Sequence, residues 1–141
     1  VRAEEVVVCT EARGLVHLAA PIWPVHGRIS RSYGGPEVHK GLDIVAPFGH
    51  QVLCPRAGRV ESVRWDPVLG LTLVLSHANN VETTYGHLSE VLVGPGDEVT
   101  VGQPIGRIGN NGHSTGPHLH WEIRVDGELQ DPALFLVGVG G

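Results

Sequence analysis

The segment Ser114-Thr115-Gly116-Pro117-His118-Leu119-His120-Trp121-Glu122 decides how this chain folds and where its chemistry lies. From His118 onward polar and apolar residues alternate. This pattern predicts a β-strand, because successive side chains of a strand point to opposite faces. The two histidines and the glutamate then share one face, and the leucine and the tryptophan share the other. We expect the first face to carry catalytic or metal-binding side chains and the second face to pack in the core.

A second segment with chemical side chains, His39-Lys40-Gly41-Leu42-Asp43, lies far upstream. Its spacing of four suits one face of a helix, but the glycine and the apolar residues that follow favour a loop that enters a strand. Together with the two histidines of the first segment, His39 and Asp43 make a set of imidazoles and a carboxylate, which are ligands that Zn²⁺ accepts. A hydrolytic zinc site has three protein ligands and one open position, so the combination predicts a metallohydrolase.

The composition favours a single all-β domain. The chain has 141 residues, of which 41% are hydrophobic, which is enough for one core and too little for two complete domains. Its 20 glycines and 10 prolines separate short apolar runs, as in proteins built from short strands and tight turns. Asp126-Gly127 is the strongest hairpin signal. The predicted strands span residues 28–32, 42–46, 51–54, 58–64, 71–76, 81–88, 98–101, 104–109 and 118–125.

Two segments, residues 54–60 and 96–106, resemble the two halves of biotinyl and lipoyl carrier domains. Such carriers are modified on a lysine between the halves, whereas the only lysine here, Lys40, precedes the first half. The resemblance therefore indicates topology and not carrier function. The predicted fold class is an all-β single domain of antiparallel strands, arranged as two sheets or as a barrel-sandwich hybrid, with the zinc site in a groove.

The N-terminal residues differ in pattern from the rest of the chain. We expect residues 1–26 to form an arm or edge segment and residues 27–141 to form the domain. Because the sequence contains no methionine, we expect it to be a mature or trimmed part of a longer chain. Cys9 and Cys54 either pair in an oxidising compartment or leave Cys54 as a small buried thiol.

Charge and hydropathy exclude two classes of partner. The formal net charge is -5, which argues against a nucleic-acid binder because phosphate neutralisation needs clustered Lys and Arg. No apolar run approaches the ~20 residues that span a bilayer, so we expect no membrane span in this sequence.

Several sequence motifs are informative about function when they are considered together. They are Gly27-Arg28-Ile29-Ser30-Arg31-Ser32-Tyr33-Gly34, the segments 39–43 and 114–122 described above, Thr84-Tyr85-Gly86-His87-Leu88, and Asp131-Pro132. In combination they resemble the zinc endopeptidases of the lysostaphin and LytM type, which cut peptide bonds in bacterial peptidoglycan. The resemblance covers most of the chain after residue 26.

The resemblance implies a role for five residues. His39, Asp43 and His120 would bind one Zn²⁺ per chain, and His87 and His118 would flank the metal without ligating it. A neutral imidazole with a pKa near 6.5 suits proton abstraction from the attacking water, and His118 is our candidate base. His87 is the candidate donor to the developing oxyanion. Because the two can exchange tasks without changing the ligand set, the sequence leaves open which one is the base.

The implied substrate is a peptide bond in a peptidoglycan cross-link or bridge, with the stem-peptide cross-link preferred over a glycine-rich bridge. The implied location is the cell envelope, periplasmic or extracellular. Some relatives of this fold have lost ligands and regulate other cell-wall hydrolases, so the alternative is a non-catalytic LytM-type binding module with protein partners. All five key residues are present here, which favours the enzyme.

Other polar residues have two interpretations each. Glu122 either accepts the free ring N–H of a histidine or lies at the cleft edge. Tyr85 should share a face with His87, where it either donates to substrate or packs as an aromatic. His17, His26, His50, His77 and His113 match no chemical position, and we expect them to be structural or solvated. The chain lacks the longer loop that many relatives have before the first ligand, which predicts a short, open groove wall.

Overall fold

The computed structural model describes residues 5–10, 14–19, 22–35, 38–112 and 114–133, and of residues 5–10 and 14–19 only the backbone. The regular secondary structure of the described residues is almost entirely β, apart from 3₁₀ conformation at Ala78–Asn80 and at residues 132–133. Every segment predicted as a strand contains one, and all strand pairs are antiparallel. The all-β fold class is therefore confirmed. The strands are β1 Glu5–Thr10, β2 Gly14–Ala19, β3 Arg28–Arg31, β4 Leu42–Val45, β5 Gln51–Leu53, β6 Gly58–Asp66, β7 Gly70–His77, β8 Val81–Val91, β9 Glu98–Val99, β10 Pro104–Ile108, β11 His118–Val125 and β12 Glu128–Gln130.

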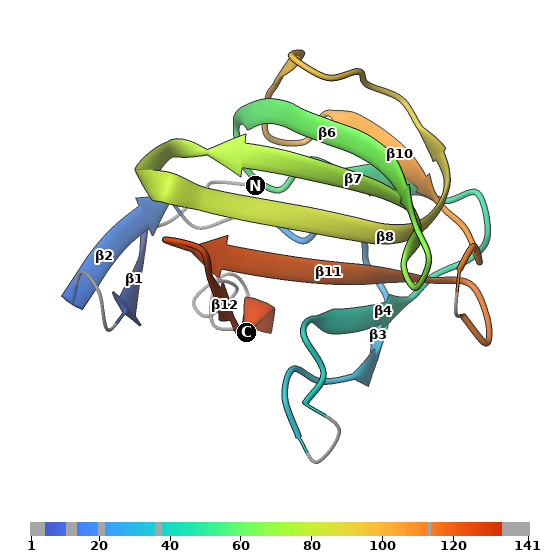
Figure 1. Ribbon diagram of the computed structural model, residues 1–141, viewed down its shortest axis with the longest axis horizontal. Coiled ribbons are helices and arrows are strands. Elements are labelled where there is room, and N and C mark those ends of the chain that lie inside the picture. The colour runs from blue at the N-terminus through green and yellow to red at the C-terminus, as the bar shows by residue number, and fades with distance from the viewer. Residues whose placement is uncertain (1–4, 11–13, 20–21, 36–37, 113, 134–141) are drawn as a thin grey trace.

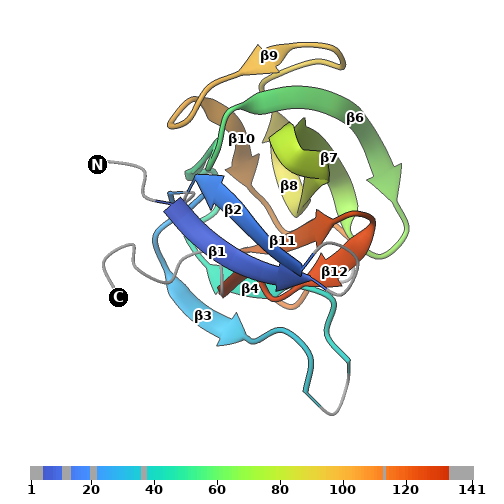
Figure 2. The same ribbon diagram turned by 90° about the vertical axis from the view of Figure 1, so that its left-hand side faces the viewer.

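Ten of these strands form one connected sheet. Its main path is β3-β4-β11-β8-β7-β6-β9, while β12 pairs with β11, and β10 pairs with both β5 and β8. The long strands β6, β7, β8 and β11 lie side by side (Figure 1). The sheet is curled, with β3 and β4 at one end of the curl and β6 and β9 at the other (Figure 2).

The core lies on one face of the long strands. In β11, Leu119 and Trp121 have no exposed surface, as the alternation predicts. Trp121 is the register partner of Tyr85 on β8, and these two are the largest fully buried side chains of the described residues. Burial of a large apolar side chain contributes about 1.5–3 kcal/mol, so this pair anchors β8 and β11 to the core. The opposite face of the same strands is thereby left for polar side chains.

The hairpin predicted at Asp126-Gly127 is confirmed. Val125 pairs with Glu128, which leaves a two-residue loop in which Asp126 and Gly127 have φ of 53° and 79°. Positive φ at both positions is the type I′ geometry that suits the twist of a hairpin. The returning strand, β12, is one that the sequence pattern did not predict.

The N-terminal strands β1 and β2 pair only with each other among the described residues. The chain then joins the main sheet through a hydrogen bond from Leu53 N–H to the carbonyl of Pro24, and Val25 is buried in the core. The division into an arm of residues 1–26 and a domain of residues 27–141 remains a prediction. Cys54 is a buried free thiol that donates to the carbonyl of Arg56, and the side chain of Cys9 lies outside the described residues.

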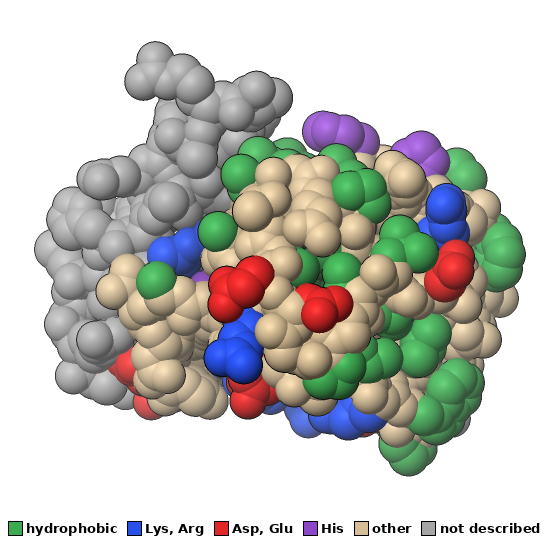
Figure 3. Space-filling model, turned by 90° about the horizontal axis from the view of Figure 1, so that it is seen from above, with side chains coloured by type: hydrophobic (Ala, Val, Ile, Leu, Met, Phe, Trp, Pro, Cys, Tyr) green, Lys and Arg blue, Asp and Glu red, His purple; other side chains and the backbone are tan. Residues whose placement is uncertain are grey.

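The described surface carries no single-sign charge region in the view from above, where acidic and basic side chains form small groups among uncharged ones (Figure 3). Within the described residues, no helix is long and apolar enough to cross a membrane. His26 and His50 are exposed, as expected, while His113 and the side chain of His17 lie outside the described residues.

Candidate metal centre and its groove

Strand pairing brings the two distant motifs together. β4 begins at Leu42, so the loop interpretation of residues 39–43 is correct, and Asp43 is the direct register partner of His120 on β11. Gly41 permits the close approach of this loop, because a Cβ at this position would lie 2.4 Å from the carbonyl oxygen of Trp121. The pairing of β4 with β11 thus fixes the distance between a carboxylate and an imidazole.

His39, Asp43 and His120 form a buried cluster. Each offers one ligand atom, and these atoms lie within 4.8 Å of one another. Oδ1 of Asp43 is 3.4 Å from Nε2 of His39 and 2.8 Å from Nδ1 of His120. Two imidazole nitrogens and a carboxylate oxygen therefore converge, which is a donor set that suits Zn²⁺.

The orientation of His39 fits a metal ion. Its Nδ1 is 3.0 Å from the carbonyl oxygen of Ser32. A carbonyl oxygen only accepts hydrogen bonds, so Nδ1 carries the proton and Nε2 directs its lone pair into the cluster. Nε2 is buried and has no hydrogen-bond partner among the described residues. A buried acceptor without a partner costs about 1–3 kcal/mol, and a bound cation would remove this cost.

The electrostatics of the cluster favour a cation. Burial opposes the charged form of His120, but its hydrogen bonds to Asp43 and Glu122 outweigh burial and raise its pKa to about 9. Burial likewise opposes ionisation of Asp43, yet the hydrogen bond from His120 and the nearby histidines give this carboxyl a net lowered pKa. Without a metal, a proton on Nδ1 of His120 thus holds the imidazole against the carboxylate.

Glu122 orients the imidazole of His120 through the ring nitrogen that does not face Asp43. Nε2 of His120 donates to Oε2 of Glu122 at 2.8 Å, so the first of the two interpretations of Glu122 is confirmed. Oε1 of the same carboxylate lies 3.8 Å from a guanidinium nitrogen of Arg124. A carboxylate that accepts the second ring N–H of a ligating histidine fixes its tautomer and raises its basicity.

His118 flanks the cluster on the same face of β11. Its Nδ1 donates to the carbonyl of Gly116 at 2.8 Å and lies 3.2 Å from Oγ of Ser114. Its Nε2 lies 3.8 Å from Oδ2 of Asp43. The loop before β11 therefore holds the imidazole of His118. When this ring is neutral, its Nε2 is an acceptor that is directed at the cluster.

His87 reaches the site through a bulge. Gly86 pairs with His120 of β11, whereas Leu88 pairs with Ile108 of β10, so β8 changes partner at His87. His87 has φ of 62°, and the register of β7 against β8 shifts at the same place. Bulges next to active sites re-aim side chains, and this one turns the imidazole to within 4.6 Å of the His118 ring, centroid to centroid.

The same bulge overturns one expectation. Tyr85 and His87 do not share a face, because the extra residue in β8 breaks the two-residue alternation between them. Tyr85 is fully buried in the core, where its hydroxyl is 2.8 Å from Oγ1 of Thr83. Of its two interpretations, packing is the correct one.

The supports of His87 were missed by the sequence analysis. Its Nδ1 donates to the carbonyl of Asn111 at 2.5 Å, and its backbone N–H donates to the carbonyl of Leu69. Gly70 allows the two supporting loops to meet, since a Cβ there would lie 2.6 Å from the carbonyl carbon of Asn111. Burial, together with the neighbouring histidines, lowers the pKa of His87 despite its bond to Asn111. The only sequence signal for this support is the turn-forming run Asn110-Asn111-Gly112.

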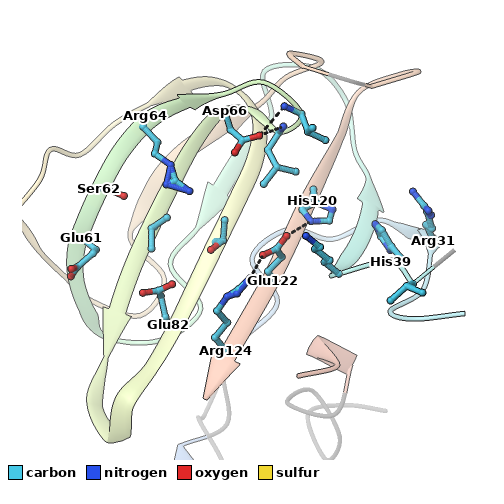
Figure 4. Close-up of a pocket in the computed structure, with 16 residues that line it drawn as sticks. Arg31, His39, Glu61, Ser62, Arg64, Asp66, Glu82, His120, Glu122 and Arg124 are labelled. Atoms are coloured by element: carbon cyan, nitrogen blue, oxygen red, sulfur yellow. Dashed lines mark hydrogen bonds and ion pairs between the residues drawn. The ribbon is translucent and has the colours of Figure 1, made fainter. Parts of the chain in front are cut away.

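Two grooves meet at the cluster, and both contain His39 and His120. The first, which we call the histidine groove, has a volume of about 590 Å³ and is lined by His87, His118 and the loop of residues 114–117. The second, which we call the charged groove, has a volume of about 580 Å³ and contains Glu61, Arg64, Glu82, Glu122 and Arg124 (Figure 4).

Comparisons with known proteins agree with this geometry. The model of peptidase family M23 matches residues 37–132. Peptidoglycan DD-endopeptidase ShyA of Vibrio cholerae serotype O1 is 44% identical over 89 residues, which are 63% of this chain and 21% of ShyA. The shares covered of two further curated relatives are 22% and 24%, so the chain spans about a fifth of their length.

Two solved structures share the fold. The catalytic domain of the antimicrobial peptidase lysostaphin from Staphylococcus simulans has a TM-score of 0.75 and 30% identity, covering 79% of this chain and 92% of that domain. A zinc containing peptidase from Vibrio cholerae has a TM-score of 0.75 and 30% identity, covering 89% of this chain and 45% of that protein.

Proposed function

The chain belongs to peptidase family M23, and from this premise we propose that it is a zinc-dependent endopeptidase that hydrolyses peptide bonds in peptidoglycan cross-links or bridges. The observation that carries the proposal is the convergence of three buried ligand atoms with Nε2 of His39 lacking any other partner among the described residues. The family match and the resemblance to ShyA support the choice of substrate.

In this proposal His39 through Nε2, Asp43 through a carboxylate oxygen and His120 through Nδ1 would hold one Zn²⁺ per chain. When bound, zinc lowers the pKa of a coordinated water to about 7 and polarises a carbonyl as a Lewis acid. Glu122 keeps Nδ1 of His120 available, because it accepts the proton on Nε2. The buried surroundings of the cluster strengthen each of these interactions.

We assign His118 as the general base. Its bond to the carbonyl of Gly116 places the ring proton on Nδ1, so neutral His118 presents the lone pair of Nε2 to the attacking water. Asp43, 3.8 Å away, stabilises the imidazolium that forms when His118 takes a proton. The same proton can then pass to the leaving amine.

We assign His87 to the developing oxyanion. Since its Nδ1 proton is committed to Asn111, neutral His87 presents an acceptor nitrogen, and it donates to an oxyanion only while it carries a second proton. Burial lowers the pKa of His87, so this proton is held only where the negative charge of the developing oxyanion favours it. The two rings are close enough to exchange proton-transfer tasks, at 4.6 Å between centroids. The division of labour between them is therefore decided by the protonation state and not by the ligand set.

The location that follows is the cell envelope, periplasmic or extracellular, where peptidoglycan lies. The first test is hydrolysis of purified cross-linked peptidoglycan by zinc-loaded protein, followed by chromatography of the released peptides. We expect about one Zn²⁺ per folded chain and a loss of cross-linked dimers, with metal-chelated protein as the matched control.

Turnover of a pentaglycine peptide, with no turnover of cross-linked stem peptides, would move the substrate to a glycine bridge. A folded, zinc-loaded protein that cleaves neither but binds peptidoglycan would instead support the non-catalytic binding module, with regulatory protein partners. Failure to bind zinc at micromolar concentration would contradict the proposal itself.

A further inference from the structure

The charged groove extends well beyond the residues that the proposed chemistry uses. Its floor is the polar face of four strands, on which Glu122, Thr84, Val74 and Ser62 are successive register partners from β11 to β6. Only the first of these contacts the metal cluster. The rest of the floor is therefore available to bind a part of the substrate away from the scissile bond (Figure 4).

Two acidic groups of this groove already have structural tasks. Glu122 accepts from His120, and Oδ1 of Asp66 accepts the backbone N–H groups of Val68 and Leu69 at 2.8 and 2.9 Å. These bonds hold the β6–β7 turn and, through it, the loop that contacts His87. Each carboxylate is therefore partly occupied by the protein itself.

Other ionised groups in the groove have no such task. Within the described part of the chain, Glu61, Arg64 and Glu82 form no ion pair within 4 Å, and Arg124 makes only the 3.8 Å contact with Glu122. The backbone N–H groups of Leu69 and Val68 lower the pKa of Asp66, and the charge of Arg64 adds to this effect. Arg64 rises from β6 and Glu82 from β8 (Figure 4). Their register partners on β7 are Thr72 and Ser76, which flank Val74 in the sequence. Glu82 is also the register partner of Arg124, so opposite charges alternate along the groove.

The alternation of charge restricts the ligand. An uncharged glycine chain would displace water from these groups without replacing its hydrogen bonds, which disfavours binding. A purely anionic or purely cationic ligand would meet like charge at half of the positions. The complementary ligand carries a carboxylate and an ammonium group a short distance apart.

We propose that the charged groove selects substrate peptides with a branch that ends in an unblocked amino acid group, whose carboxylate contacts Arg64 and whose ammonium contacts Glu82. The inference rests on the proposed function, because it places this branch beside the peptide bond to be cut. Charge-assisted hydrogen bonds to both groups supply the selectivity, and the uncharged floor at Val74 accommodates the carbon chain.

The test uses four peptides with one backbone and one scissile bond. In the first the branch end is free, in the second its carboxylate is amidated, in the third its amine is acetylated, and in the fourth both are blocked. Their affinities for zinc-loaded protein are measured by calorimetry, and their kcat and KM are measured separately. We expect each single block to weaken binding about threefold to tenfold, mainly through KM.

Three variants connect this selectivity to the groove. In Arg64→Ala the penalty for amidation should disappear while the penalty for acetylation remains, and Glu82→Gln should show the reverse. Arg59→Ala removes an exposed arginine of β6 that does not line the groove, so it should keep both penalties.

The outcomes separate the inference from the proposed function. Equal affinity of the wild type for all four peptides, absence of any binding, or penalties that persist in both groove variants would overturn the inference, even if all four are cleaved. Selective binding that follows the variants, without cleavage of any peptide or of peptidoglycan, would uphold the inference and contradict the enzyme.

Discussion

The histidine groove and the charged groove meet at His120 and differ in how firmly their polar side chains are held. In the histidine groove, His87 and His118 are each fixed by a hydrogen bond from Nδ1 to a backbone carbonyl. In the charged groove, the long side chains of Arg64 and Glu82 end without an ion pair among the described residues. Proton transfer requires fixed geometry, whereas recognition of a flexible peptide tolerates side chains that order on binding.

The largest expected effect separates ligands from catalytic residues within the histidine groove. His120→Ala should lose stoichiometric zinc and activity together, because it removes a ligand atom. His118→Ala should keep zinc and lose about 10² to 10⁴ in rate, because it removes only the proposed base. Zinc content by elemental analysis, beside peptidoglycan hydrolysis, measures both.

A matched control comes from outside both grooves, since Arg59→Ala should keep both zinc content and activity. If His118→Ala folds but no longer holds zinc, the assignment of His118 as a catalytic residue is wrong and it belongs with the ligands. If His120→Ala keeps full zinc, the proposed ligand set is wrong.

A smaller effect tests the carboxylate of the charged groove that accepts from His120. Glu122→Gln keeps a hydrogen-bond acceptor for His120 but removes the negative charge that raises the basicity of this imidazole. We expect zinc affinity to fall about 10-fold to 100-fold, measured by competition with a chelator of known affinity. Glu82→Gln makes the same chemical change elsewhere in the charged groove and should leave zinc affinity unchanged. Equal zinc affinities of the two variants would show that the charge of Glu122 is not needed and that a neutral acceptor orients His120 equally well.

Strand alternation made most of this site predictable. The alternation from His118 to Glu122 correctly assigned the two faces of β11. The pair Asp126-Gly127 correctly predicted the hairpin that follows this strand. Both features are local, because the two-residue alternation and the turn residues each involve neighbouring positions of the sequence. The grouping of His39 and Asp43 with the histidines of β11 was inferred from the chemistry of these residue types, and the resemblance to a known family separated the ligand His120 from the flanking His118.

The supports of His87 could not be predicted from the sequence because they depend on contacts between distant loops. The bulge at Gly86-His87 forms where the pairing partner of β8 changes from β11 to β10, and no short-range sequence pattern predicts this change. Asn111 contributes a backbone carbonyl, which every residue type possesses. The error about Tyr85 has the same origin, since the two-residue alternation holds only in an uninterrupted strand.

The smallest expected effect concerns a histidine outside both grooves, His77, whose pKa is lowered mainly by burial and also by the charge of Arg56. His77 donates from Nδ1 to the carbonyl of Ala57 at 2.9 Å, and its Nε2 is 2.7 Å from Oγ1 of Thr83. Burial lowers the pKa of His77 below its ordinary value of 6.5, against the smaller effect of the bond to Ala57. Below about pH 6.5 the unfolded chain therefore binds more protons than the folded protein at this position.

The stability that neutral His77 contributes is thus present above about pH 6.5 and is lost as pH falls through the folded pKa. His77→Gln should be less stable than wild type near neutral pH, and the gap in free energy of unfolding should narrow from about pH 7 to about pH 5. Urea denaturation of metal-free wild type and variant measures this gap, and titrations shared by both cancel in the difference. His50→Gln removes an exposed histidine and should follow the wild-type curve. A gap that stays constant with pH would mean that His77 acts only through its hydrogen bonds and that its pKa is the same in the folded and the unfolded protein.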